Sequence, residues 1–443
     1  MSEATAAREP GFLDGFRELE RDLAGRGPEW LRRLRRQHLE RFERVGFPSV
    51  REEQWRNTNV APIAATPFAP PPDESGIEPV LSGLAALDLG GPRLVFVDGR
   101  HVAQLSTGDA GPGVRLSSLG HILDTEPELV RAAWTRAEPD SVDAFRALNH
   151  ALATDGAVIV IAEGVALEQP IHVVHVATAA GRPTATHSRS VVLVGRGARA
   201  TLVESFVGLG AGAYLTNSIT DLDIGADAQL EHYRAQLEAP QAFHVSHVTS
   251  RQDARSRYAA CHASFGARLA RNELRCELAG PDANTLLDGL YLTVGDQHLD
   301  NQTVVDHAAP RCNSREVFKG ALAGRSRGVF HGRIVVRPGA QQTDAKQSNP
   351  NLLLSREALA QTRPQLEIRA DDVKCTHGAT IGRLDEDALF YLRSRGLGAV
   401  HARALLVEAF LGEVLERVHV APLRRFLEQL VSERLAALPD GAA

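Results

Sequence analysis

The middle of the chain constrains its fold most strongly. From about residue 151 to residue 382 the sequence contains short β-type runs and no segment with a helix-length apolar period. Examples are AVIVIAEGVALEQPIHVVHVA, SVVLVGRGARATLVESFVG and NSITDLDIGADAQLEHYRA, in which Gly, Asp and Asn turns join the runs. So many short strands without intervening helices exclude a doubly wound fold. A sandwich, a propeller and a parallel β-helix remain.

A loose repeat of turn sequences favours one of these three folds. The turns that recur, at irregular spacing, are VGRGARATL, IGADAQLEH, LAGPDANTLL and LAGRSRGVF. Aromatic residues make up only 5% of the chain, and the Val, Leu and Ile runs are of the kind that stack in successive turns of a solenoid. Both features favour a β-helix. We therefore predict a mainly β protein with a parallel β-helix core over residues 151–382.

Residues 1–150 are predicted to form a helical region with a small hairpin and a linker. Apolar residues recur at helical spacing in FLDGFRELERDL, in WLRRLRRQHLERFERV and across residues 126–150. Two short apolar runs flank Asp98-Gly99 in RLVFVDGRHVAQL, which predicts a β-hairpin. The Pro-rich residues 64–75 predict a linker or an extended crossing.

Residues 383–443 are predicted to form a second helical region. Asp385 is a suitable N-cap for a first helix, which Gly396 would end. Two amphipathic helices follow, with the sequences ALLVEAFLGEVLERV and LRRFLEQLVSERLAAL. An apolar stripe of this kind usually packs in a core, but in a small end-piece it could also face a partner.

Composition excludes several classes of protein. The net charge is −6 and no basic run stands out, so nucleic-acid binding is not expected. No window approaches the ~18 apolar residues of a membrane span. The first residues lack a basic segment followed by an apolar one, which argues against a secretory signal and for a cytoplasmic protein. The four cysteines form no Cys-x-x-Cys pair, so reduced thiols are expected, with Cys261, Cys276 and Cys312 as small buried residues.

Residues 371–382, DDVKCTHGATIG, carry the main chemical candidates. On a strand, alternation places Val373, Cys375 and His377 on one face and Lys374 and Thr376 on the other. A thiol and an imidazole suit iron or zinc. Two ligands do not complete a site, so a metal bound here would be shared with another chain. A Cys–His nucleophile pair and a purely structural pair, with a buried thiol and a hydrogen-bonded imidazole, stay open as alternatives.

Standard catalytic and nucleotide motifs are missing from the sequence. There is no Gly-x-x-x-x-Gly-Lys-Ser/Thr loop, no His-Glu-x-x-His and no Gly-x-Ser-x-Gly. The chain is therefore not expected to hydrolyse nucleotides itself. Only three of the 49 basic residues are lysines, and Lys319, Lys346 and Lys374 lie close together in the sequence. Either this is chance, or these positions require a compact ammonium.

A long C-terminal stretch resembles a known family. FKGALAGRSRGVFHGRIVVRPGAQQTDAKQSNPNLLLS, followed by PQLEIRADDVKCTHGATIGRLDEDALFYLRSRGL, is similar to the SufB/SufD family of iron–sulfur cluster assembly proteins. GFPSVREEQW, near the N-terminus, is similar to a Trp-containing segment of the same family. KCTHGAT resembles the SufD form, because the interval before it contains no thiol of the kind found in the SufB form.

This resemblance implies a fold, partners and a role. The fold would be a right-handed parallel β-helix flanked by helices. The chain would act as a scaffold subunit that pairs with a SufB-like paralogue, while residues 383–443 help to recruit a SufC-like ABC ATPase that hydrolyses ATP. A transient iron–sulfur cluster would form at the interface between the paralogues, with His377 as a cluster ligand or a residue on the path of sulfur and Cys375 as an auxiliary thiol or a packing residue. No cofactor would stay bound to the isolated chain. Homodimerisation of that chain, and binding of reduced flavin to the complex, are left open.

The next helix, ALFYLRSRGL, supplies a candidate partner surface. Phe390, Tyr391, Arg393 and Arg395 are predicted to face the ATPase, and the alternative is that this helix packs against the end of the β-helix. Two other functions stay open for the whole chain. One is a metal-free, homo-oligomeric interaction protein. The other is a carbohydrate-active β-helix enzyme, which the lack of a clear acid pair on one strand face disfavours.

Overall fold

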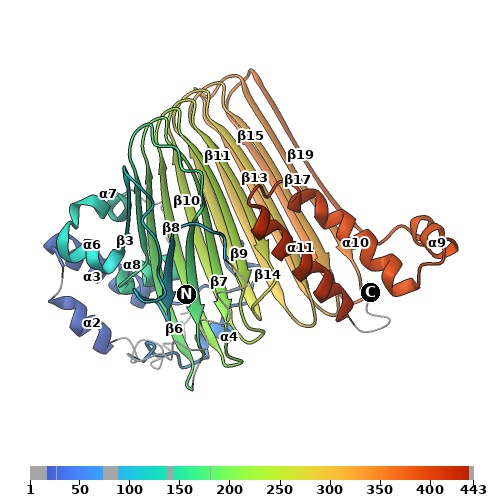
Figure 1. Cartoon of the computed structure of the whole chain (residues 1–443), viewed down its shortest axis with the longest axis horizontal. Helices are drawn as coiled ribbons and strands as arrows, with labels where there is room; N and C mark the ends of the chain where they lie inside the picture. Colours follow the sequence, from blue (N-terminus) through green and yellow to red (C-terminus); the bar gives the residue numbers. More distant parts are fainter. Residues whose placement is uncertain (1–16, 26, 73–87, 137–142, 180, 439–443) are drawn as a thin grey trace, which may run out of the picture.

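A parallel β-solenoid forms the centre of the molecule (Figure 1). The computed structural model describes residues 17–25, 27–72, 88–136, 143–179 and 181–438. From β4 to β19 successive strands alternate between two sheets, and each strand pairs in parallel with the strand two positions further along the chain. The prediction of a mainly β protein with a parallel β-helix is therefore confirmed.

Each sheet contributes one strand to every turn of the solenoid. The first sheet contains β4 (Ala157–Ile161), β6 (Thr184–Val194), β8 (Tyr214–Ile224), β10 (Phe243–Gln252), β12 (Leu269–Leu278), β14 (His298–His307), β16 (Arg327–Val336) and β18 (Leu359–Ile368). The second contains β5 (Ile171–Ala177), β7 (Arg199–Gly208), β9 (Gln229–Leu237), β11 (Arg257–Ser264), β13 (Asn284–Thr293), β15 (Asn313–Leu322), β17 (Thr343–Leu353) and β19 (Val373–Gly382). Because neighbouring strands are in register, side chains on one face form columns that run along the solenoid.

The recurrent turn sequences stack from one turn of the solenoid to the next. Asp227 and Asp282, each in one of these turns, have positive φ angles of 61° and 63°. This left-handed conformation costs most residues about 1–2 kcal/mol. The N–H of Asp227 donates to the carbonyl of Ala254 (2.9 Å), and that of Asp282 donates to the carbonyl of Pro310 (3.2 Å). The loose sequence repeat therefore reflects a backbone conformation that hydrogen bonds between successive turns hold in place.

The predicted hairpin lies at the N-terminal end of the solenoid and is confirmed. It consists of β1 (Arg93–Val97) and β2 (Arg100–His101), which pair antiparallel. Asp98 and Gly99 both have positive φ, as a two-residue type I′ turn requires. β1 also joins the second sheet beside β5, and β3 (Val114–Ser118) joins the first sheet antiparallel to β4. Antiparallel strands thus end both sheets on this side.

Helices cover the outer face of the first sheet near its N-terminal end (Figure 1). They are α2 (Arg17–Ala24), α3 (Glu29–Val45), the 3₁₀ helix η1 (Glu53–Trp55), α4 (Ala61–Ala64), α6 (Leu119–Thr125), α7 (Glu128–Thr135) and α8 (Ala144–Leu152). α7 and α8 confirm the helical prediction for residues 126–150, while residues 137–142 lie outside the described residues, as do Phe12 and Phe16. In the described part of the Pro-rich segment, Ala69 forms a parallel bridge with Thr184, so the chain crosses here in extended form.

The C-terminal region forms α9 (Glu386–Ser394), α10 (Ala399–Leu415) and α11 (Ala421–Ala436). Asp385 caps α9 as predicted, since its carboxylate accepts from the N–H of Asp387 (2.9 Å) and of Ala388 (3.3 Å). The apolar stripe of α11, including Leu427, is buried in one cluster with residues of α10 and the second sheet. The stripe is therefore core. Among the helices that the structure describes, none is both long enough and apolar enough to cross a membrane.

Lys319 fastens α10 to the second sheet. This lysine is buried on β15, and its Nζ donates to the carbonyl of Phe410 (3.0 Å) and pairs with Glu413. The ammonium also lies 4.6 Å from the centroid of the Phe410 ring. Lys346 and Lys374 are exposed, so the three lysines do not share one role. Only Lys319 occupies a position where the structure uses a compact buried ammonium.

We expect Lys319→Met to lower the free energy of unfolding by about 1–3 kcal/mol, because a buried carbonyl and the paired carboxylate lose their donor. Lys346→Met is the matched control and should change stability by less than about 0.5 kcal/mol, since its side chain is exposed. Chemical denaturation of both variants measures the effect. Equal stability of the two variants would contradict an anchoring role for Lys319.

Three of the four cysteines are buried, as predicted. Cys261, Cys276 and Cys312 lie inside or beneath the solenoid sheets, and burial raises the pKa of Cys276 to about 12. Thiols of this kind contain little reactive thiolate at neutral pH. Cys375 is the exception, because it lies on the last strand and is only half-buried.

Candidate functional site

The solenoid is open at its C-terminal end. β18 and β19 are the last strands of their sheets, and no other strand among the described residues pairs with their outer edges. Apolar side chains are exposed on both strands, namely Leu359 (41%), Ile368 (41%) and Ile381 (47%). A long, unpaired strand edge presents backbone donors and acceptors to which a strand of another chain can bind. We call β18 and β19 together the open end.

The sequence candidates Cys375 and His377 lie in the middle of the open end. Cys375 packs against the last apolar cluster of the solenoid, whereas His377 is exposed. Lys374 and Thr376 project from the other face of β19 and are exposed. The burial of residues 373–376 alternates as predicted. His377 is on the surface and Cys375 is only half-buried, which fits the alternative of a buried thiol with a hydrogen-bonded imidazole less well.

The environment of Cys375 does not favour a nucleophile. Burial raises the pKa of its thiol, although a backbone hydrogen bond from Ala345 opposes this effect. A nucleophilic cysteine requires the opposite shift, toward thiolate at neutral pH. This geometry fits a thiol that packs beside an exposed histidine better than it fits a Cys–His nucleophile pair.

A buried polar column lies behind His377. Gln347 is opposite His377 on the neighbouring strand β17, and Glu316 is opposite Gln347 on β15. The Nε2 of Gln347 donates to Oε2 of Glu316 at 2.6 Å, and both side chains are buried. Burial raises the pKa of Glu316 to about 7, against hydrogen bonds from Thr303 and Gln347 that lower it. From the open end into the solenoid, the column thus contains the imidazole of His377, the amide of Gln347 and the carboxyl group of Glu316, whose pKa is about 7.

Comparison with known proteins agrees with this geometry. Residues 6–173 match the family model described as the SufBD protein N-terminal region, and residues 175–410 match the one described as "SUF system FeS cluster assembly, SufBD core domain". The chain belongs to the SufBD family. The resemblance seen in the C-terminal stretch therefore extends along nearly the whole chain.

Three named proteins are similar to this chain over most of their length. The iron–sulfur cluster assembly protein SufD of Escherichia coli is 33% identical over 414 residues, which cover 92% of this chain and 93% of that protein. A SufBD family iron–sulfur cluster assembly protein of Synechocystis is 31% identical, with 88% and 87% covered. Protein ABCI7, chloroplastic, of Arabidopsis thaliana is 33% identical, with 87% and 82% covered. The chain is thus a SufD-type iron–sulfur cluster assembly protein.

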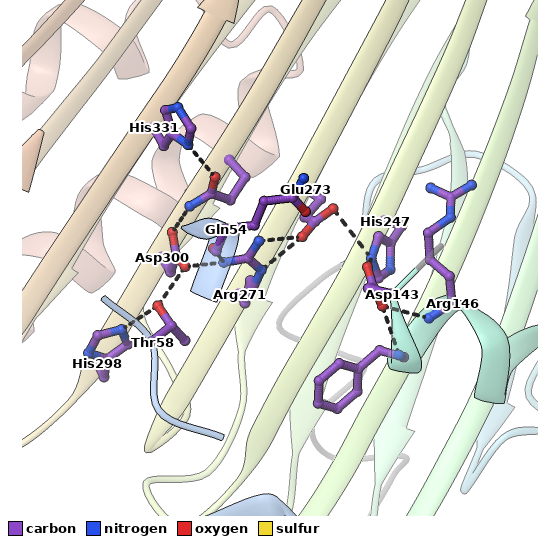
Figure 2. A network of polar contacts seen from close by, with 12 residues as sticks. Gln54, Thr58, Asp143, Arg146, His247, Arg271, Glu273, His298, Asp300 and His331 are labelled. Atoms are coloured by element: carbon purple, nitrogen blue, oxygen red, sulfur yellow. Dashed lines mark hydrogen bonds and ion pairs between the residues drawn. The ribbon is translucent and has the colours of Figure 1, made fainter. Parts of the chain in front are cut away.

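The Trp-containing segment near the N-terminus, which also resembles the SufBD family, binds the outer face of the first sheet (Figure 2). The guanidinium of Arg271 on β12 lies 3.8 Å from the centroid of the Trp55 ring, and its Nη1 donates to the carbonyl of Gln54 (3.0 Å). Thr58 donates to Asp300 on β14 at 2.6 Å. The segment therefore serves as a structural clamp that holds the N-terminal region on the solenoid.

The same surface holds three side chains with metal-ligating atoms close together (Figure 2). The ligand atoms of Asp143, His247 and Glu273 all lie within 4.8 Å of one another. Protein groups already bind both carboxylates: Asp143 caps α8, and Arg271 donates twice to Glu273 (2.8 and 2.6 Å). His247 donates to Asp143 (2.9 Å) between them. These hydrogen bonds explain why the three side chains lie close together. They hold α8 against the first sheet.

The predicted partner-facing residues lie on α9 and at its C-cap, Arg395, at the far end of α10 from the solenoid (Figure 1). Phe390 is 73% exposed and Tyr391 is 57% exposed, although both are large and apolar or aromatic. Arg393 is exposed, and Arg395 donates to the Tyr391 hydroxyl at 3.2 Å. Leu389 is the buried residue of this helix. The four side chains are thus available to a partner, and their role stays a prediction.

Proposed function

We propose that the chain is a SufD-type scaffold subunit that pairs with a SufB-like paralogue through its open end. A nascent iron–sulfur cluster is the cargo that forms at this junction. One observation carries the proposal: the solenoid ends in β18 and β19, whose outer edges pair with no other described strand, and the exposed His377 lies midway along β19. Strand edges of this length pair readily with a similar edge of another chain.

The donor set supports a shared site. A neutral imidazole ligates iron, and in clusters of the Rieske type histidines replace cysteines. His377 and Cys375 supply at most two ligands, whereas a cluster needs four or more. The remaining ligands must then come from the partner chain, which suits a location at a pairing edge rather than inside one subunit.

The C-terminal helices support the second part of the proposal, in which a SufC-like ABC ATPase binds to this end of the subunit. Exposed aromatic residues such as Phe390 and Tyr391 are typical of interface cores. Arg393 and Arg395 would form the charged rim of that interface. ATP hydrolysis would belong to the partner, since the sequence contains no phosphate-binding loop.

Adding charge to the open end tests the pairing mode. We expect the double variant Ile368→Lys/Ile381→Lys to weaken binding to the SufB-like paralogue at least roughly tenfold, because lysines on a strand edge oppose pairing. Co-purification after anaerobic co-expression, followed by a binding titration, measures this. The control is Val45→Lys/Val50→Lys, which adds the same charge at positions that are 48% and 47% exposed near the other end of the chain.

The two double variants separate the explanations. Loss of the complex only with the open-end variant supports pairing through β18 and β19. Unchanged binding by that variant would place the paralogue on another surface. Equal loss with both variants would mean that added positive charge alone opposes association.

A further inference from the structure

A strongly basic cavity lies on the outer face of the first sheet, away from the open end. Its volume is about 260 Å³. The lining contains more arginine than any other residue type, and two acidic residues. The arginines are Arg136, Arg146, Arg189, Arg251, Arg275 and Arg337, and the acids are Asp221 and Glu277. We call it the arginine cavity.

Three of these arginines are held firmly by carboxylates. Arg189 is buried and donates to Asp221 at 2.8 Å. Arg136 donates to both oxygens of Asp223 (2.5 and 2.6 Å), and Arg337 donates to both oxygens of Asp306 (2.9 and 2.7 Å). These contacts fix the walls of the cavity. Fixed guanidinium groups lose little conformational entropy when an anion binds.

Two other arginines are only loosely paired. Arg251 lies 3.9 Å from Glu277, and Arg275 lies 3.6 Å from Asp306, whose two oxygens already accept from Arg337. Both distances exceed that of a charge-assisted hydrogen bond. These guanidinium groups therefore have donors available for a further acceptor in the cavity.

The described lining of the cavity is mainly cationic. Arg275 and Arg337 share one carboxylate, that of Asp306. Burial lowers the pKa of Arg275, Asp306 opposes this, and the nearby Arg333 and Arg146 lower it further. Cations held together in this way are stabilised when an anion binds between them.

A hydroxyl group adds to the donor set. Thr249 lines the cavity directly opposite Arg275 in the strand register. Its Oγ1 is buried and has no hydrogen-bond partner among the described residues. A buried hydroxyl without a partner costs about 1–3 kcal/mol, which a bound acceptor would recover. Guanidinium groups and a hydroxyl group thus both line the arginine cavity as hydrogen-bond donors.

We propose that the arginine cavity binds a phosphate group. Arginine forks match the tetrahedral oxygens of phosphate, and a bound phosphate would accept from the loosely paired Arg251 and Arg275 and from the Thr249 hydroxyl. The phosphate is either a free ion or part of an organic ester. A second, more open hollow of about 550 Å³ shares Arg136 and Arg251 with the cavity and has apolar walls that include Val160 and Leu193, where the organic part of an ester would lie.

Isothermal titration of the full chain with inorganic phosphate and with phenyl phosphate tests this site, with ionic strength held constant by chloride. We expect saturable one-to-one binding. The double variant Arg251→Gln/Arg275→Gln should weaken it at least roughly tenfold. The control Arg255→Gln/Arg311→Gln removes the same charge from exposed turn arginines paired with Asp227 and Asp282, and should bind like the parent.

Each result has a definite meaning. Tighter binding of phenyl phosphate than of phosphate identifies an ester as the ligand class, and equal binding identifies free phosphate. No saturable binding of either probe, or equal weakening in both double variants, overturns the proposal. If the cavity variant melts well below the parent, Arg275→Lys replaces it, because that change keeps the charge and removes the fork. Unchanged phosphate binding by Arg275→Lys and by Arg251→Lys would also overturn the proposal.

Discussion

His377→Ala is expected to reduce the iron–sulfur cluster content of the anaerobically co-expressed complex at least roughly tenfold. The substitution removes an exposed imidazole from the open end, and it should leave the solenoid intact because this side chain lies on the surface of the last strand. The iron and sulfide content of the purified complex, together with its visible absorption spectrum, measures the effect.

The design of this experiment rests on two comparisons. His121→Ala removes an exposed histidine from α6, near the opposite end of the solenoid, and should leave cluster content unchanged. His377→Cys replaces the imidazole with another iron ligand and should restore part of the cluster. Normal cluster content in His377→Ala would remove this residue from the proposed mechanism. Loss of the complex itself would instead show a role in pairing, which gel filtration distinguishes.

Cys375→Ala separates the roles of the two neighbours. Since Cys375 packs against the last apolar cluster, its loss should lower stability by about 0.5–1.5 kcal/mol and reduce cluster content less than His377→Ala does. An equal loss of cluster in both variants would make the thiol a ligand rather than an auxiliary group.

Much of the fold could be predicted because the solenoid is built from local signals. Short β runs, repeated turn sequences and the Asp98-Gly99 pair each specify structure within a few residues. Alternation along one strand placed Cys375 and His377 on the same face for the same reason. The exposure of His377 did not follow from the sequence, because it depends on β19 being the last strand of its sheet.

The arginine cavity and the polar column could not be found in this way. Arg136 and Arg337 are about 200 positions apart and meet only because solenoid turns stack in one register. Gln347 and Glu316 likewise lie on different strands. A weak signal did exist: DAKQSNPN places polar residues, including Gln347 and Asn349, at the inward positions of β17. Polar residues at inward positions of a β-helix indicate a buried network.

Glu316→Gln is expected to stabilise the chain at pH 8 and to change its stability little at pH 5. Burial raises the pKa of Glu316 from its usual 4.5 to about 7, so between these pH values the folded chain binds more protons than the unfolded chain. The stability of the parent therefore falls as pH rises through this window and levels off above pH 7. A shift of this size corresponds to about 3 kcal/mol.

The neutral amide removes this dependence on pH. Glutamine keeps a carbonyl to accept from Gln347, although it loses the second carboxylate oxygen, so the net gain at pH 8 should be about 1–3 kcal/mol. Thermal melting and urea unfolding of parent and variant at pH 5 and pH 8 measure it, with Glu357→Gln, an exposed residue, as the control. A variant that loses stability between pH 5 and pH 8 as steeply as the parent would show that another group causes the fall. A flatter curve in Glu316→Gln alone would show that a carboxyl group two strands inside the open end is neutral at pH 5 and charged at pH 8.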